Sequence, residues 1–348
     1  MRIIACMSGT SLDGLDIAFC EFSTSSKSIN YKIENAITYK YSKEWENKLK
    51  NAPHLSGLEL KMLDNKYGLL IADYINNFIK QNRLTNIDYI ASHGHTVFHQ
   101  TEKNITLQIG DSISIASSTN IPIINDFRSL DVSLNGQGAP LVPIGDKLLF
   151  SEYDYCLNLG GFSNVSFEEN KKRIAFDIAP VNLILNHYSK TLGFDFDNNG
   201  EIGAKGVLIP SLLLELNKIE YYSKPAPKSL GAEWLDENFF PLISKHYKVE
   251  DILRTLYEHI AVQIGTILCK ENSKTLVTGG GAFNSFLIQK IKEYAKSQII
   301  LPPKELIDFK EALIFGLLGY LRATNRINVL KSVTGAKRDS CSGNIILP

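Results

Sequence analysis

The sequence has 348 residues, of which 44% are hydrophobic and 21% charged, with 37 basic and 37 acidic side chains. This balance argues against disorder and against nucleic acid as a partner, and the length is sufficient for two domains with cores of their own. No apolar stretch is long enough to span a membrane and none resembles a signal peptide, so we expect a cytoplasmic protein without a membrane partner.

The chain opens with two short apolar strands that flank a polar turn, within residues 2–22. The glycines of the turn allow close approach of the backbone, its Thr and Ser offer donors to anionic oxygens, and Asp13 or Asp16 could hold a hydrated cation. A polar turn without a ligand uses the same residue types. Two acidic residues beside a donor-rich loop nevertheless favour a nucleotide. The predicted ATP-binding loop consists of Gly9, Thr10, Ser11, Leu12, Asp13, Gly14, Leu15 and Asp16.

A helix and a buried strand are predicted next. Apolar residues at spacings of three and four predict an amphipathic helix from Ser56 to Gln81, with Ser56 as its N-cap. Residues 88–93 predict a buried strand that delivers polar side chains at its carboxyl end, where open α/β sheets bind ligands. Because His93 and His95 alternate along a strand, we predict hydrogen bonds to substrate or structure for them and no metal site.

A second cycle repeats the plan of residues 3–22. It consists of a strand at 153–159, a turn at Gly160 and Gly161, and a returning strand at 164–167. A helix over 252–268, a strand over 275–278 and a helix over 308–323 follow. This pattern predicts an α/β fold of two domains, which resembles the duplicated, RNase H-like plan of actin, heat-shock ATPases and sugar kinases, with a nucleotide cleft between the halves.

We place the first domain at residues 1–127, with residues 308–348 packing back on it, and the second at 128–307. The second domain then contains the second hairpin and the turn at 279–281. Glycine turns in both domains indicate a nucleotide, although a tight strand-to-helix turn explains the last one equally well. Outside the first hairpin, the predicted ATP-binding residues are Gly160, Gly161, Gly280, Gly281 and Asn284.

A kinase that acts on a hydroxyl needs a carboxylate to take up a proton and Mg²⁺ to neutralise the migrating phosphoryl group. Asp177 is our candidate base, because it closes the predicted strand 173–176 just before Pro180. Its alternative role is to cap a helix that starts at Val181 or Asn182.

Four residues are assigned to the substrate site. Asp126 and Arg128, in the segment Asn125-Asp-Phe-Arg128, could bind sugar hydroxyls or a carboxylate, although a surface ion pair would look the same in sequence, and of the two we choose Arg128. Glu311 begins the last predicted helix and faces the cleft or solvent, where the helix dipole alone could favour it. His93 and Asn182 complete the set.

The chain resembles the anhydro-N-acetylmuramic acid kinases along nearly its whole length. The motifs that carry the resemblance are Met7-Ser-Gly-Thr-Ser-Leu-Asp-Gly-Leu-Asp16, Ser92-His-Gly-His-Thr96, Asn125-Asp-Phe-Arg128, Gly136-Gln-Gly-Ala-Pro-Leu-Val-Pro143, Asn158-Leu-Gly-Gly-Phe-Ser-Asn164, Phe176-Asp177, Pro227-Lys-Ser229, Gly279-Gly-Gly281, Glu311-Ala312 and Ser332-Val-Thr-Gly-Ala336. The resemblance implies an ATP-dependent enzyme of cell-wall recycling that opens the 1,6-anhydro ring of 1,6-anhydro-N-acetylmuramic acid with water and phosphorylates O6. It also implies a homodimer, and it maps the base that activates the water onto Asp177.

The sequence departs from the family pattern beside that base. Ala179 and Val181 replace two glycines, and we expect their Cβ atoms to narrow the space around Asp177. His95 occupies the position where the family has a glutamine. Leu230 and Ala232 occupy positions where the family has a threonine and an arginine. A kinase for levoglucosan, a smaller anhydro sugar, and a non-catalytic binding protein on the same fold are therefore the alternatives.

Overall fold

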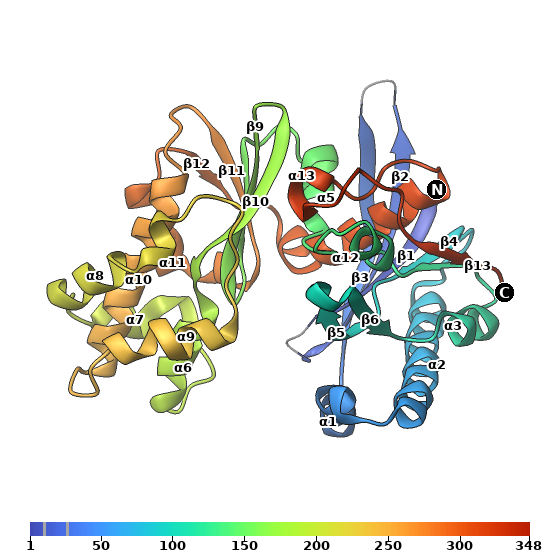
Figure 1. Cartoon of the computed structure of the whole chain (residues 1–348), viewed down its shortest axis with the longest axis horizontal. Coiled ribbons are helices and arrows are strands. Elements are labelled where there is room, and N and C mark those ends of the chain that lie inside the picture. The colour runs from blue at the N-terminus through green and yellow to red at the C-terminus, as the bar shows by residue number, and fades with distance from the viewer. Residues whose placement is uncertain (10–11, 26–27) are drawn as a thin grey trace. The chain divides into compact units, whose positions relative to one another are not determined.

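The computed structural model describes residues 1–9, 12–25 and 28–348, which fall into two α/β units (Figure 1). Unit 1 comprises Met1–Leu149 and Phe309–Pro348, and unit 2 comprises Phe150–Asp308. The chain therefore leaves unit 1, completes unit 2 and then returns to unit 1.

Unit 1 is built on a six-stranded sheet with the order β13-β7-β4-β1-β2-β3. Its strands are β1 (Arg2–Ser8), β2 (Gly14–Thr24), β3 (Ile29–Lys40), β4 (Tyr89–Ser92), β7 (Ile123–Asn125) and β13 (Asn344–Ile346). The first three strands are antiparallel, whereas β4 pairs in parallel with β1 and with β7. Ser8 pairs with Leu15, so the predicted first hairpin is present, and Gly9, Leu12 and Asp13 lie between its two strands.

Helices cover both faces of this sheet. Along β1 the side chains alternate, so that Ile4 and Cys6 join α2 in one core cluster while Ala5 faces α12. The predicted helix is α2 (Gly57–Asn82), and Ser56 caps it in a capping box with Glu59. The other helices of unit 1 are α1 (Lys43–Asn51), α3 (Ser112–Thr119), α4 (Ser129–Ser133), α5 (Val142–Leu149) and α13 (Lys331–Thr334), with short 3₁₀ turns at Ala52–His54 and Thr101–Lys103. A small separate sheet pairs β5 (His95–Gln100) with β6 (Ile105–Ile109).

The predicted domain boundary at 127/128 differs from the observed one, because the structure groups residues 128–149 with unit 1. Two buried contacts hold this stretch to the returning end of the chain. Asp146 on α5 forms an ion pair of 2.7 Å with Lys310 on α12 (Lys304–Ala323). Asp131 on α4 accepts a hydrogen bond of 2.8 Å from the Thr334 hydroxyl. These tertiary contacts leave no mark in the local pattern from which the boundary was predicted.

Unit 2 repeats the sheet of unit 1. Its strands lie in the order β10-β9-β8-β11-β12, which matches β3-β2-β1-β4-β7 of unit 1 strand for strand. They are β8 (Tyr155–Leu159), β9 (Phe162–Glu169), β10 (Lys172–Pro180), β11 (Lys274–Thr278) and β12 (Gln298–Ile300). In both sheets the first three strands are antiparallel and the next two parallel. The duplicated α/β plan expected from the sequence is confirmed.

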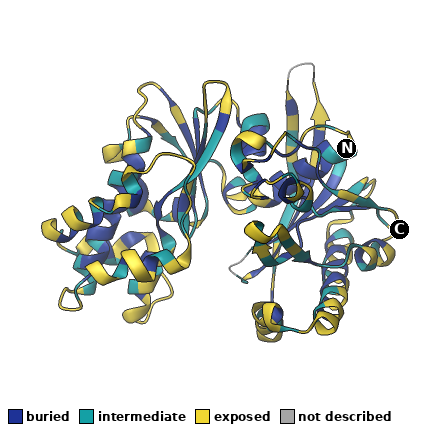
Figure 2. Cartoon of the chain, viewed as in Figure 1, coloured by how far each residue is buried: buried dark blue, intermediate teal, exposed yellow. Residues whose placement is uncertain are grey.

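The helices of unit 2 pack on its sheet around one large apolar core, and in Figure 2 the buried residues follow the strands and the inner sides of the helices. The helices are α6 (Asn182–Thr191), α7 (Glu201–Lys205), α8 (Pro210–Asn217), α9 (Ala232–Asn238), α10 (Val249–Ile267) and α11 (Ser285–Tyr294), with 3₁₀ turns at Asn198–Gly200, Glu220–Ser223, Phe240–Leu242 and Gly280–Phe283. The stripe predicted over 252–268 is the buried face of α10.

Candidate functional site

The first hairpin places the ATP-binding residues predicted for unit 1 at one end of its sheet. Gly9, Leu12 and Asp13 lie in the loop, and Thr10 and Ser11 lie outside the described residues. The remaining three residues begin β2. A Cβ on Gly14 would lie 2.7 Å from the Tyr39 carbonyl oxygen, so β3 leaves no room for a side chain at this position. Leu15 is buried in the core of unit 1.

Asp16 is the acidic side chain at the base of this loop, and Asp13 is exposed within it. Oδ1 of Asp16 accepts a hydrogen bond of 2.5 Å from the Thr38 hydroxyl on β3. The hairpin therefore carries two carboxylates, one of them oriented by a neighbouring strand.

A buried chain of hydroxyl groups fixes the start of the loop. The Tyr41 hydroxyl lies 2.6 Å from that of Tyr67 and donates to Ser8 Oγ over 3.0 Å, and Ser8 Oγ lies 3.3 Å from His95 Nδ1. Since Tyr41 directs its one proton toward Ser8, Tyr67 donates to Tyr41. Burial lowers the pKa of His95 to about 4, so the ring of His95 is neutral at neutral pH. Ser8 directly precedes Gly9, so this chain orients the loop.

His93 and His95 do not alternate along one strand, contrary to the prediction. β4 ends at Ser92, β5 begins at His95, and Gly94 between them has a φ of +75°, a conformation that favours glycine. A Cβ at Gly94 would also lie 2.5 Å from the Ile109 carbonyl oxygen. The turn gives each histidine its own set of partners.

Arg128 holds His93 in a defined tautomer. Its Nε donates to His93 Nε2 over 3.0 Å, and its Nη1 donates to the Gly138 carbonyl oxygen over 2.6 Å. Burial, assisted by the charge of Arg128, lowers the pKa of His93 well below its ordinary value, so the ring is neutral with its proton on Nδ1. The neighbouring Asp126 has a different contact, because its Oδ1 accepts from the Ser129 N–H at the start of α4.

Glu311 lies near Arg128, as the pKa of Arg128 indicates. Burial lowers that pKa to about 10, and the negative charge of Glu311 opposes the shift. Glu311 was predicted to begin the last helix, but α12 begins at Lys304, so Glu311 lies beyond the first turn, where the helix dipole has little effect. His93, Arg128 and Glu311 thus gather in unit 1.

The second hairpin and the glycine turn meet in unit 2. The carbonyl oxygens of Gly160 and Gly161 accept hydrogen bonds from the N–H groups of Asn182 and Val181, at 3.2 and 2.8 Å. Asn182 Nδ2 donates to the Leu159 carbonyl oxygen and would be the nearest atom, at 3.7 Å, to a Cβ on Gly280. Asn182 therefore lies between the two turns predicted to bind ATP.

Asn284 has a structural role. Its Oδ1 accepts from the Leu287 N–H and caps α11, and its Nδ2 donates to the Tyr257 hydroxyl over 2.8 Å. Its side chain thus caps α11 and joins it to α10.

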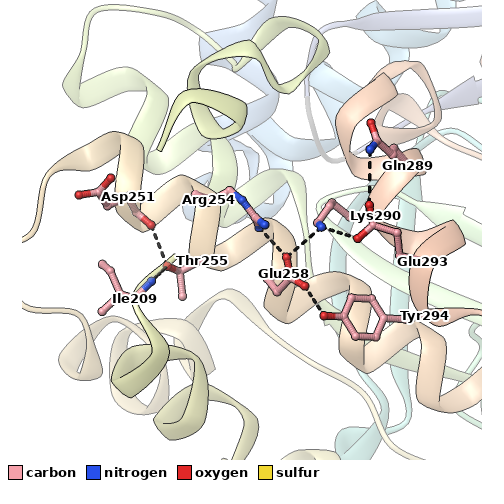
Figure 3. A network of polar contacts seen from close by, with 9 residues as sticks. All are labelled: Ile209, Asp251, Arg254, Thr255, Glu258, Gln289, Lys290, Glu293 and Tyr294. Atoms are coloured by element: carbon pink, nitrogen blue, oxygen red, sulfur yellow. Dashed lines mark hydrogen bonds and ion pairs between the residues drawn. The ribbon is translucent and has the colours of Figure 1, made fainter. Parts of the chain in front are cut away.

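Figure 3 shows how α11 is fixed to α10. Glu258 on α10 binds Arg254 at 2.5 Å, Lys290 at 3.2 Å and the Tyr294 hydroxyl. Lys290 also pairs with Glu293. The turn at 279–281 is followed, after Asn284, by α11, so this network, centred on the buried Glu258, holds the helix next to the turn.

Asp177 lies within β10 rather than at its end. The register of β10 against β9 shifts between Asp177 and Ala179, which marks a β-bulge at the predicted base. Oδ2 of Asp177 accepts from the Leu230 N–H over 2.9 Å. Burial raises the pKa of Asp177 above its ordinary value, and the Leu230 hydrogen bond opposes this. Asp177 caps no helix, since α6 has no side-chain cap.

The residues that replace the family glycines are packed inside unit 2. Ala179 and Val181 are fully buried and belong to its apolar core. Val181 has a φ of −129°, which any residue adopts. A narrower space beside Asp177 stays a prediction.

Sequence reasoning gave no role to Tyr221, Lys228 and Leu230, which contact Asp177 or each other. Residues 227–229 carried part of the family resemblance, and this was the available signal. No group of three His, Cys, Asp or Glu residues suited to a metal occurs in the ranges that the structure describes. In the same ranges, no helix is both long and apolar enough to cross a membrane.

The chain is similar to proteins named anhydro-N-acetylmuramic acid kinase. The one from Francisella tularensis subsp. novicida is 32% identical, and the match covers 98% of this chain and 97% of the relative. The one from Haemophilus influenzae is 34% identical, and the match covers 95% of this chain and 94% of the relative. Another from Clostridioides difficile is 34% identical over 99% and 98%.

Solved structures that match the chain have lower sequence identity to it than these relatives. The activator of a 2-hydroxyisocaproyl-CoA dehydratase from Clostridium difficile, with bound ADPNP, gives a TM-score of 0.45 at 12% identity over 93% of this chain and 96% of that one. A ROK family glucokinase from Streptomyces griseus, in complex with glucose and AMPPNP, gives 0.41 at 11% identity over 91% and 99%. The model of the family described as anhydro-N-acetylmuramic acid kinase matches residues 1–348, and the chain belongs to that family.

Proposed function

We propose that this protein is an ATP-dependent kinase that opens the 1,6-anhydro ring of 1,6-anhydro-N-acetylmuramic acid with water and phosphorylates O6. The products are N-acetylmuramic acid 6-phosphate and ADP. The match of the whole chain to one kinase family is the observation that carries this proposal. The half-buried Asp177, held at a bulge by the Leu230 N–H, supplies a group suited to the hydrolytic step.

Asp177 is the general base of the proposed reaction. It takes a proton from a water molecule whose oxygen bonds to C1 of the sugar, and the bond from C1 to O6 breaks. O6 then attacks the γ-phosphorus, and ADP leaves. The raised pKa of Asp177 suits a base that must accept a proton near neutral pH, and a base in this position contributes roughly 10²–10⁴-fold to rate.

Each unit contributes to ATP binding in this proposal. The hairpin loop of residues 9–13 in unit 1, and the turns at 160–161 and 280–281 in unit 2, bind the nucleotide. Asp13 or Asp16 holds Mg²⁺, because Mg²⁺ in kinases needs one or two carboxylates besides water and phosphate oxygens. When bound, Mg²⁺ neutralises charge on the phosphates.

Unit 1 supplies the sugar-binding side chains. Arg128 and Glu311 offer a cation and a carboxylate in one place, and the neutral His93 is fixed beside them. Asn182 is proposed to act through the turns that it joins rather than on the sugar.

Product analysis tests the proposal. Wild-type protein with ATP, Mg²⁺ and the anhydro sugar in ¹⁸O-water should give a 6-phosphate with the label at the anomeric oxygen. Asp177→Asn should lower kcat by about 10²–10⁴-fold and leave the affinity for ATP unchanged. Full activity of this variant would exclude Asp177 as the base.

Two further outcomes separate the alternatives. A higher kcat/KM for levoglucosan would favour the smaller anhydro sugar as substrate. Absence of ADP release with either sugar would favour a binding protein without turnover. The proposed cytoplasmic location follows from the need for ATP, and the homodimer from the family resemblance, which sedimentation of the purified protein would test.

A further inference from the structure

Tyr221 and residues 228–230, which together we call the clamp segment, contact Asp177 at the free edge of β10. This strand ends the sheet of unit 2 and pairs only with β9 within it. The backbone N–H of Asp177 donates to the Lys228 carbonyl oxygen over 3.2 Å, and its carbonyl oxygen accepts from the Tyr221 hydroxyl over 2.7 Å. The clamp segment therefore binds both backbone polar groups of Asp177.

The same segment also holds the side chain of Asp177. The Leu230 N–H binds Oδ2, whereas Oδ1 accepts no hydrogen bond from any residue that the structure describes. One carboxylate oxygen is thus fixed, and the other remains available to a water molecule.

The bulge is tied on its other side by Ser163. The buried Ser163 hydroxyl donates to the Ala179 carbonyl oxygen over 3.0 Å and accepts from the Ala179 N–H over 3.2 Å. β9 therefore fixes the end of the bulge, and the clamp segment fixes its beginning at Asp177. Without the clamp segment, the backbone at Asp177 would have an unpaired edge.

Tyr221 is itself rigidly held. It is buried, its ring packs 5.5 Å from that of Trp234, and Lys228 Nζ lies 4.7 Å from the ring centroid while donating to the Tyr221 carbonyl oxygen over 3.1 Å. Burial raises the pKa of Tyr221, and the negative charge of Asp177 raises it further. The phenol consequently remains a hydrogen-bond donor at working pH.

We propose that Tyr221 is a positioning residue for the hydrolytic step, because its hydroxyl holds the Asp177 backbone so that Oδ1 faces the attacking water. This inference rests on the proposed function, since it requires Asp177 to be the base. Displacing a reacting group by about 1 Å can lower a rate by roughly a hundredfold.

Tyr221→Phe and Tyr222→Phe form a matched pair. Each variant removes one hydroxyl group. The Tyr221 hydroxyl binds the Asp177 carbonyl oxygen, whereas the Tyr222 hydroxyl lies 2.8 Å from His259 Nε2. We expect Tyr221→Phe to lower kcat about 10- to 100-fold with KM for ATP unchanged. The acid limb of its pH profile should move to higher pH, because a displaced carboxylate loses part of the Leu230 hydrogen bond. Tyr222→Phe should retain wild-type kcat and acid limb.

If Tyr221→Phe does not fold, Lys228→Met is a second variant. It removes the ammonium group that holds the Tyr221 carbonyl oxygen, and we expect the acid limb of its pH profile to move to higher pH as well. Equal kcat in both tyrosine variants, or an unchanged acid limb in Tyr221→Phe and Lys228→Met, overturns the inference. If Asp177→Asn is inactive while Tyr221→Phe is normal, only the inference fails. If Asp177→Asn is fully active, the proposed base fails and the inference with it.

Discussion

Arg128 donates a hydrogen bond from Nε to Nε2 of His93 over 3.0 Å, and its Nη1 reaches the Gly138 carbonyl oxygen at the same time. A lysine at position 128 cannot make both contacts, because it has no planar group with two separated donors. We expect Arg128→Lys to raise KM for the sugar on the order of tenfold, the loss of about one hydrogen bond, with KM for ATP unchanged.

Arg326→Lys is the control for that variant, because Arg326 also uses Nη1 within unit 1 but donates to Thr24. Steady-state kinetics with each substrate varied in turn would compare the two. An equal rise of KM for the sugar in both variants would contradict a role for Arg128 at the sugar.

The glycine turn of unit 2 offers a test of ATP binding. A Cβ on Gly280 meets no atom closer than 3.7 Å, whereas one on Gly281 would lie 2.8 Å from Leu159 Cβ. We therefore expect Gly280→Ala to raise KM for ATP without changing Tm, and Gly281→Ala to lower the free energy of unfolding by about 1–3 kcal/mol. Thermal unfolding and ATP titrations measure both. An unchanged KM in Gly280→Ala would show that the nucleotide does not approach this turn.

Activity should fall on the acid side through the titration of Asp177. Burial raises its pKa above the ordinary value of 3.8, and only the deprotonated form accepts a proton from water. The acid limb of kcat/KM for the sugar, which reports the free enzyme, should therefore have its inflection above pH 3.8. Short assays, with the fold checked by circular dichroism at each pH, give this profile. A flat profile down to pH 3.8 would contradict the assignment.

Stability should decrease as the pH falls below about 6.5. The pKa of His95 is lowered from 6.5 to about 4 in the folded protein, so between these values the unfolded chain binds a proton that the folded protein does not. His95 alone lowers the free energy of unfolding by up to about 1.4 kcal/mol for each pH unit in this range. His95→Gln should flatten the curve of unfolding free energy against pH, whereas the same change at the exposed His54 should not. Parallel curves for His95→Gln and wild type would contradict this.

Lys310 and Asp146 form a buried ion pair that joins α12 to α5. Lys310→Met removes the ammonium group that pairs with the buried Asp146 carboxylate, and we expect the free energy of unfolding to fall by about 3–5 kcal/mol. The double variant with Asp146→Leu should recover part of this loss, since it also removes the buried carboxylate. Denaturant unfolding of the single and double variants measures the coupling, and additive losses would show that the two side chains act independently.

Local sequence signals were sufficient for several of the elements and for the duplicated plan. The Ser56 cap, the apolar stripe of α10 and the two glycine hairpins each depend on a few neighbouring residues, and the structure has them where predicted. Each of these signals depends only on residues that are close together in the sequence.

The features that could not be predicted depend on distant partners. The bulge at Asp177 is bound by residues more than forty positions away, and the contact from Tyr221 has no periodicity that would mark it. The backbone contacts of Asn182 and Asn284 could not be predicted for the same reason, because a polar side chain beside a glycine turn can bind the backbone as readily as a ligand.

The two-part composition of unit 1 affects how the chain matures on the ribosome. Residues 1–149 are translated before unit 2, whereas α12 and β13, which complete unit 1, follow it in the chain. Until these elements are made, the sheet of unit 1 lacks the cover of α12, and the edge of β7 is open to pairing with other chains. A premature stop codon after unit 2 would therefore leave unit 1, the part of the molecule that was made first, incompletely folded.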